Sequence, residues 1–139
     1  MNQEEFYKYL AKIPKAELHI HIEAVPTLNT IKALYDKRFG TPMSDQDADN
    51  LFSYEDLNGF IQAFLQVQDL LISVDDFNYI FDDFCDYLVA NNIRYCEAFF
   101  APSAFLKKGF KYSEMVAVFS KKIAQIKKET GIIIKLLLD

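Results

Sequence analysis

Three short segments with strand-like sequences are separated by long stretches with helical periodicity. The segments are AELHIHI at residues 16–22, IRYCEAFF at 93–100 and IIIKLLLD at 132–139. Parallel strands need a crossover connection of a dozen or more residues, usually a helix, whereas antiparallel strands can be joined by a tight turn. The order of strands and helices therefore predicts an α/β fold with a parallel sheet. The unbroken apolar third segment predicts a strand that is covered on both faces.

The stretches between these segments carry the cap and stop residues of helices. Residues 4–11 form a short amphipathic pattern that ends at Pro14. The other predicted helices run from Pro26 to a stop at Gly40, from a cap at Ser53 through Leu71, from a cap at Ser73 to Asn91, and from Ser113 to Thr130. Residues 41–50, with at most one helical turn, and the segment around residues 107–109 are predicted to be loops.

Composition predicts a single globular domain over residues 1–139. The chain is 51% hydrophobic and has a net charge of −5, which argues against a nucleic-acid or anionic-membrane surface because such surfaces need basic residues. It has neither a signal-peptide pattern at the N-terminus nor an apolar run long enough to span a membrane, so we expect a cytoplasmic protein.

Cys85 and Cys96 do not form a C-x-x-C pair and are predicted to be buried free thiols.

The two histidines of the chain both lie in the first strand-like segment. Alternate residues of a strand share a face, so His19 and His21 project together, and Glu17 and Glu23 are expected on the same face. Two imidazoles spaced in this way can converge on one divalent transition metal. A hydrogen-bonded polar pair without a metal fits the same spacing. The H-x-E order also matches half of the motif of zinc deaminases that act on cytidine, but the P-C-x-x-C segment of that class is missing.

The longer string IPKAELHIHIEAV resembles the opening of the adenosine deaminase family, in which a Glu-Leu-His-x-His core is followed by an acidic residue. LNGFIQAFLQV resembles the family helix that covers the substrate, and NIRYCEAFFAPSAFLKKG resembles the second strand and its exit loop. The resemblance implies the N-terminal part, about three βα units, of an eight-stranded β/α (TIM-like) metallohydrolase barrel. It also implies metal-dependent deamination of a purine nucleoside, adenosine to inosine plus ammonia, in the full-length enzyme.

The same resemblance assigns roles to five residues. It makes His19 and His21 ligands of one zinc ion, Glu23 a substrate contact, and Phe60 and Phe64 an apolar lid over the purine. For the two phenylalanines, four residues apart, a place in the helix core fits the spacing as well. Members of the family supply the catalytic residues and the other ligands from later strands, so we expect no catalytic residue in this chain and the missing groups downstream of Asp139.

Departures from the family pattern leave the substrate open. Ala24 stands where the family usually has glycine, and Glu23 where many members have aspartate. Glutamate is common at this position in relatives that act on adenine or modified purines, so adenine is an alternative to adenosine. Two further alternatives are a different amidohydrolase built on the same His-x-His strand, and an inactive remnant that binds a partner or complements the missing C-terminal part of the barrel.

Expressed alone, residues 1–139 are expected to be poorly soluble or partly ordered and to lack deaminase activity, because the first and third strands would expose unpaired edges. Ammonia release from adenosine by the purified polypeptide tests this expectation. Robust conversion to inosine would contradict it.

Overall fold

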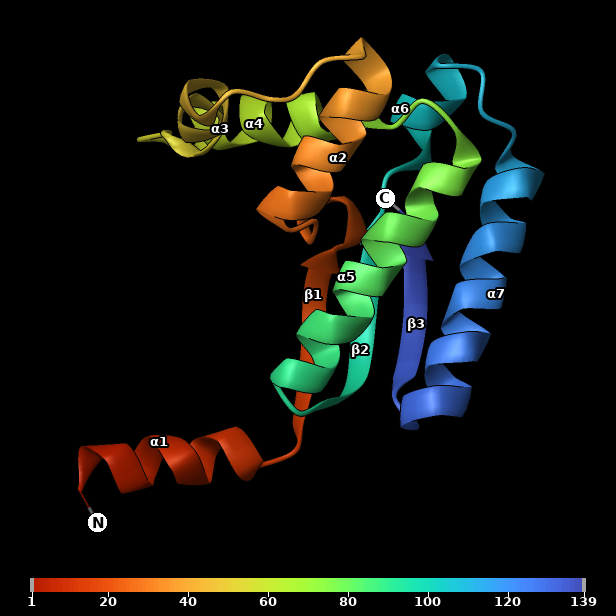
Figure 1. Ribbon diagram of the computed structural model, residues 1–139. Coiled ribbons are helices and arrows are strands. Elements are labelled where there is room, and N and C mark those ends of the chain that lie inside the picture. The colour runs from red at the N-terminus through yellow and green to blue at the C-terminus, as the bar shows by residue number, and fades with distance from the viewer. Residues whose placement is uncertain (1, 139) are drawn as a thin grey trace.

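Three parallel strands form one sheet in the order β1-β2-β3. The computed structural model describes residues 2–138, and the strands are β1 (Lys15–His21), β2 (Ile93–Phe100) and β3 (Ile133–Leu138) (Figure 1). The predicted parallel α/β arrangement is therefore confirmed. Asp139, which ends the third predicted strand, lies outside the described residues.

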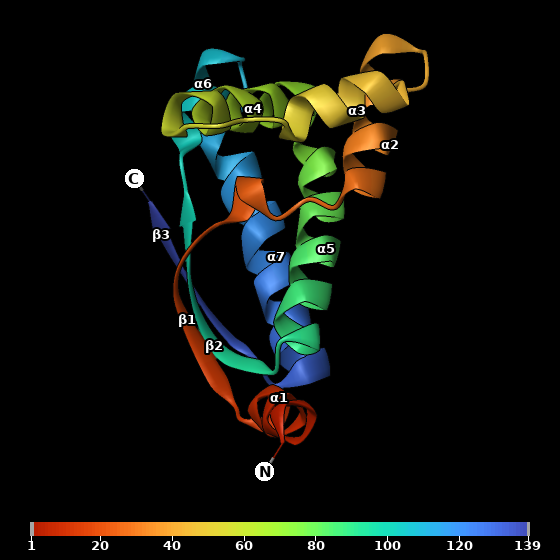
Figure 2. The ribbon, with the colours of Figure 1, turned by 90° about the vertical axis from the view of Figure 1, so that its left-hand side faces the viewer.

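The helices fall into two groups around the sheet. The long helices α5 (Phe77–Ala90) and α7 (Tyr112–Thr130) cover one face (Figures 1 and 2). Shorter elements lie beyond the carboxyl ends of the strands: η1 (Ile22–Ala24), α2 (Leu28–Phe39), α3 (Asp45–Phe52), α4 (Leu57–Leu70), η2 (Val74–Asp76) and α6 (Pro102–Lys107). None of the helices within residues 2–138 is both long and apolar enough to cross a membrane.

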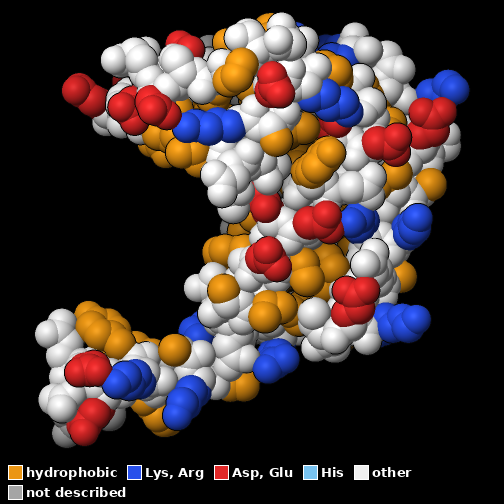
Figure 3. Space-filling view, viewed as in Figure 1, with side chains coloured by type: hydrophobic (Ala, Val, Ile, Leu, Met, Phe, Trp, Pro, Cys, Tyr) orange, Lys and Arg blue, Asp and Glu red, His pale blue; other side chains and the backbone are white. Residues whose placement is uncertain are grey.

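Helix α1 (Gln3–Lys12) projects from the amino-terminal end of β1 and buries none of its residues. Its position leaves the molecule hollowed on one side, between α1 and the α3–α4 region (Figure 3). On the face shown in Figure 3, basic and acidic side chains are interspersed. The expectation that the protein does not bind nucleic acid stays a prediction.

Most helix ends follow the local sequence signals. The Thr27 hydroxyl accepts a hydrogen bond from the Thr30 N–H at the start of α2, and Gly40 ends that helix with φ of +69°. A left-handed conformation of this kind favours glycine, which has no Cβ atom to clash. Gly131 ends α7 in the same way, with φ of +76°.

Three local predictions were wrong. Residues 41–50 are not a loop, because α3 begins after Ser44, whose hydroxyl accepts from the Asp47 N–H, and it buries Ala48 and Leu51. Helix α4 begins after Asp56 rather than Ser53, since it is the Asp56 carboxylate that accepts from the Gly59 N–H. The third error is the omission of α6, which forms at residues 102–107 and buries Phe105, whereas residues 108–109 of the predicted loop do form a turn.

A cluster of phenylalanines fills the space between the sheet and the helices that cover it. The ring of Phe77 lies 4.8 Å from Phe119, 5.0 Å from Phe105 and 5.6 Å from Phe100, measured between centroids, and all four are at most 1% exposed. Most of these contacts have edge-to-face geometry, which is a favourable arrangement for aromatic pairs. This cluster fixes the end of β2 against α5, α6 and α7.

The two cysteines are free thiols, as predicted. Cys85 is partly buried on α5, and Cys96 is fully buried on β2. Burial, together with the nearby carboxylates of Glu17 and Glu97, raises the pKa of Cys96 to about 12. The Cys96 thiol therefore stays protonated at neutral pH.

The opposite face of the sheet is open along the part of the chain that the structure describes. On β2, Cys96, Ala98 and Phe100 face the helices and are buried, whereas the alternating residues are only partly covered. Ile133 of β3 pairs with Tyr95 on this open face and is 43% exposed. The prediction that β3 is covered on both faces was therefore wrong for residues 133–138, since an apolar run does not reveal which face has a partner.

Asp76 is a buried carboxylate that joins three elements at the start of α5. It is fully buried, it forms an ion pair with Lys37 of α2, and its Oδ2 atom accepts from the N–H groups of Ile72 and Ser73 at 2.9 Å each. Burial raises the pKa of Asp76, but the Lys37 and backbone hydrogen bonds outweigh it, so the net shift is downward.

We expect Asp76→Ala to lower the free energy of unfolding by about 2–4 kcal/mol at pH 7, because two buried N–H groups lose their acceptor. The pKa of Asp76 is lowered in the folded state. Its contribution to the free energy of unfolding is therefore complete above a pH of about 3.9, the pKa in the unfolded state, and is lost as the pH falls through the pKa in the folded state. Urea unfolding at pH 7 and pH 3 should therefore show a smaller difference between variant and wild type at pH 3.

The neighbouring exposed residue provides the control. Asp75→Ala should change the free energy of unfolding little at either pH. Equal losses in the two variants would show that the buried network does not have the stabilising role assigned to it.

Candidate functional site

The side chains of His19 and His21 converge at the carboxyl end of β1. Their Nε2 atoms are 3.4 Å apart, and their ring centroids are 5.4 Å apart. A separation of 3.4 Å is long for a hydrogen bond between two nitrogens. Two nitrogens bound to one tetrahedral zinc ion, at about 2.0–2.1 Å each, would lie about 3.3 Å apart. The spacing of the two Nε2 atoms therefore fits one edge of a tetrahedral metal site.

The described residues supply only part of such a site. Within residues 2–138, no group of three or more His, Cys, Asp or Glu side chains is arranged to hold a metal ion. A tetrahedral zinc ion needs four donors. Two imidazoles would therefore provide half of the shell.

Phe99 of β2 is the aromatic wall behind the histidine pair. It is opposite His21 in the parallel ladder, and its ring stacks on that of His19 with centroids 4.3 Å apart. From the other side, the edge of Phe64 approaches His21 with centroids 6.0 Å apart. Phe99 was not predicted as a site residue, although its alternation with the buried Cys96, Ala98 and Phe100 could have placed it on the histidine face.

A β-bulge in β1 changes which residues share the histidine face. Glu17 pairs with Cys96 and Ile20 with Ala98, so a three-residue step on β1 opposes a two-residue step on β2. Because Cys96 and Ala98 both face the helices, Glu17 does as well, and its carboxylate accepts a hydrogen bond from Tyr87 of α5 at 3.4 Å. The expectation that Glu17 joins the histidines was wrong.

The bulge also affects Leu18, which strict alternation would place on the helical face together with Ile20 and Ile22. Its side chain is 58% exposed, whereas Ile20 is partly buried against the core and Ile22 is fully buried. A strict two-residue period therefore holds only for the second half of β1.

Glu23 lies in η1, two residues beyond His21, and is fully buried. Its Oε1 atom accepts a hydrogen bond from the Ala101 N–H at 3.0 Å and one from the Gln68 side chain at 3.4 Å. Charged side chains are rarely buried without such partners. Elements η1, β2 and α4 thus meet at this carboxylate.

A small cavity lies between Glu23 and helix α4. Its volume is about 90 Å³, and its walls are Glu23, Ala24, Pro26, Ile31, Leu51, Phe52, Tyr54, Phe60, Ala63, Phe64 and Val67. Complete small-molecule sites usually measure about 300–1,000 Å³. This cavity is therefore large enough to form only part of a ligand site.

Phe60 and Phe64 both line this cavity, and neither is buried in the helix core. Phe60 is 40% exposed, Phe64 is partly buried, and their ring centroids are 6.4 Å apart. Tyr54 packs its ring against Phe60 at 5.5 Å. Gly59 permits this approach, since a Cβ atom at that position would lie 2.8 Å from the Cβ atom of Tyr54.

The sequence model of the adenosine deaminase family matches residues 14–139. The chain belongs to the adenosine deaminase family. This membership confirms the resemblance of IPKAELHIHIEAV and of the two later segments.

Individual members of the family are distant in sequence. An adenine deaminase from Chlorobium phaeobacteroides is 27% identical over 135 residues, which cover 94% of this chain and 40% of the relative. The crystal structure of an amidohydrolase from Burkholderia ambifaria with bound Zn has a TM-score of 0.84 at 22% identity. The match covers 99% of this chain and 38% of the Burkholderia chain. The structure of adenine deaminase from Arthrobacter aurescens has a TM-score of 0.77 at 23% identity. The match covers 90% of this chain and 39% of the Arthrobacter chain.

These comparisons also identify the architecture. The structural neighbours are TIM-barrel amidohydrolases, so the three parallel strands of this family member are part of a β/α barrel. Side chains at the carboxyl ends of such strands form the active sites of these barrels. The chain spans about 40% of the length of the relatives that it matches.

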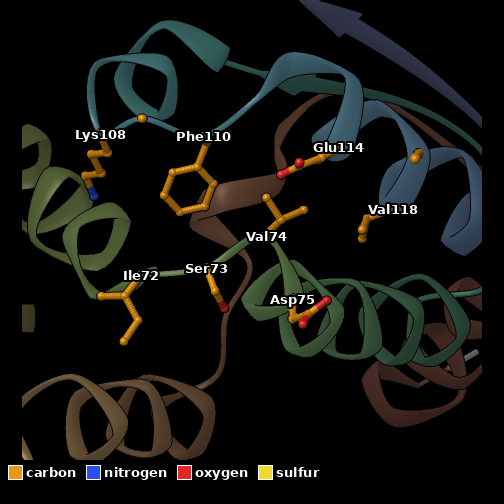
Figure 4. Close-up of a pocket in the computed structure, with 10 residues that line it drawn as sticks. Ile72, Ser73, Val74, Asp75, Lys108, Phe110, Glu114 and Val118 are labelled. Atoms are coloured by element: carbon orange, nitrogen blue, oxygen red, sulfur yellow. The ribbon is translucent and has the colours of Figure 1, made fainter.

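A larger hollow lies on the helical side of this family member, away from the histidine face. It measures about 610 Å³ and is wide open, with Lys108 and Phe110 on one side and Ile72 and Ser73 on the other (Figure 4). It includes none of the residues predicted to bind metal or substrate. The candidate site is therefore the smaller cavity beside the histidine pair.

Proposed function

We propose that the protein containing this chain catalyses the metal-dependent hydrolytic deamination of a 6-aminopurine. Water would replace the exocyclic amino group with a carbonyl oxygen, and ammonia would leave. The observation that carries the proposal is the 3.4 Å spacing of the His19 and His21 Nε2 atoms at the carboxyl end of a barrel strand. Membership in the adenosine deaminase family supports it.

His19 and His21 would hold a zinc ion through their Nε2 atoms, and each would have to be in the tautomer that leaves Nε2 unprotonated. When bound, the zinc ion acts as a Lewis acid that lowers the pKa of a water molecule. Stacking on Phe99 restricts the rotation of the His19 ring, so the two nitrogens stay aimed at a common point.

Glu23 would bind and orient the purine. Its carboxylate lies at the cavity beside α4, where it can accept a hydrogen bond from an N–H or O–H group of the substrate. Phe60 and Phe64 would cover the ring and exclude water from that side. The general acid and base of the reaction are expected outside this chain.

Adenine and adenosine are the two candidate substrates. The relatives from Chlorobium phaeobacteroides and Arthrobacter aurescens carry the name adenine deaminase. By the family resemblance, Glu23 is the longer acidic residue that is common in members acting on adenine. This observation favours adenine over adenosine, which the resemblance first implied.

Expressed with its natural downstream sequence, the protein should lose its zinc when either His19 or His21 is replaced by alanine. We expect the affinity for zinc to fall at least about 100-fold in each variant, because one of few ligands is removed. Metal content after dialysis, measured by mass spectrometry, reports the loss.

Glu17→Gln is the matched control, since Glu17 lies on the same strand but faces α5. It should retain the metal content of the wild type. Full zinc retention by either histidine variant would rule out the ligand assignment.

Adenine, adenosine and deoxyadenosine should be compared in a single assay of ammonia release by the zinc-loaded protein. We expect the value of kcat/KM to be highest for adenine, and Glu23→Ala to lower it about 100-fold or more, because a charged hydrogen bond to the substrate is lost. If none of the three purines releases ammonia although zinc is retained, the proposed function is wrong.

A further inference from the structure

Gln68 is a buried amide on a helix face that otherwise carries aromatic side chains. It is 3% exposed and lies one turn beyond Phe64 and two turns beyond Phe60 on α4. Burying an amide costs free energy unless its polar atoms are hydrogen-bonded. Methionine, an unbranched side chain of similar length, could occupy the same space without that cost. The partner of the Gln68 amide therefore indicates its role.

That partner is the carboxylate of Glu23. The Gln68 Nε2 group donates to Glu23 Oε1 at 3.4 Å, and the Ala101 N–H donates to the same oxygen at 3.0 Å. The two donors come from α4 and from the end of β2, and so approach from different elements. Together they restrict the rotation of the carboxylate.

The backbone of Gln68 is itself held in place. Its carbonyl oxygen accepts a hydrogen bond from Lys108 Nζ at 2.7 Å, and the same lysine pairs with Asp69 at 2.8 Å. Carbonyl groups in the last turn of a helix lack the intrahelical donors available further back, so an external donor stabilises the helix end. The side-chain amide thus extends from a fixed position toward Glu23.

We propose that Gln68 is a positioning residue that holds the Glu23 carboxylate in the orientation that accepts a hydrogen bond from the purine. The inference rests on the proposed function, and it makes α4 the element that joins Glu23 to the aromatic cover formed by Phe60 and Phe64. Gln68 does not touch the substrate itself and acts through Glu23.

Gln68→Met in the complete zinc-loaded protein is the direct test, because it removes the donor and keeps the length of the side chain. We expect KM for the purine to rise about 10-fold, as for the loss of one hydrogen bond to a charged group, while kcat changes less than about 3-fold. Zinc content should equal that of the wild type.

Gln62→Met is the matched control, since Gln62 is an exposed glutamine on the same helix. It should leave both KM and kcat unchanged. A Gln68→Met variant with wild-type KM would overturn the inference, because a merely structural glutamine would change only the stability of the protein.

A second measurement distinguishes this inference from the proposed function. If the wild-type protein releases no ammonia from any purine, the proposed function fails, and urea unfolding of Gln68→Met, Glu23→Ala and the double variant then decides whether Gln68 holds Glu23. The contact between Gln68 and Glu23 is supported if the unfolding equilibrium constant of the double variant differs by about 2-fold or more from the value expected for independent substitutions. Additive effects of the two substitutions would overturn it.

Discussion

The parallel pairing of β1 with β2 is the interaction on which the candidate site depends. It places Phe99 opposite His21 and against the ring of His19, and it brings the Ala101 N–H at the end of β2 to the carboxylate of Glu23. The residues that it joins are about eighty positions apart in the sequence. Helix α5 lies between them in the chain and covers the other face of the same two strands, so one crossover unit forms both the core and the site.

Much of the architecture could be predicted because its signals are local. The three strands, the Gly40 and Gly131 helix ends and the histidine pair all follow from spacing and cap residues within a few positions. Helix α3 was missed because an eight-residue polar segment buries only Ala48 and Leu51, which is too few apolar residues to show a period. Helix α6, which was also missed, is only six residues long and begins at Pro102, a residue that can end a strand as well as open a helix.

The errors in the site have a different origin, since they depend on contacts between distant segments. The bulge in β1 is visible only when its residues are matched to those of β2, so strict alternation placed Glu17 on the wrong face. The contacts of Glu23 with Gln68 and Ala101 likewise join positions 45 and 78 residues apart. Sequence patterns identified Glu23 as a candidate residue, but only the fold shows which groups hold its carboxylate.

The β1 bulge means that the two imidazoles are oriented by different means. His21 lies in the regular part of the ladder, where its backbone is fixed by pairing with β2, whereas His19 lies within the irregular step between Glu17 and Ile20. The direction of the His19 ring therefore depends on a side-chain contact, its face-to-face stacking on Phe99. Phe99 thus restricts the rotation of the His19 ring in the absence of any ligand, which reduces the side-chain entropy that the two imidazoles would lose on binding the proposed cation.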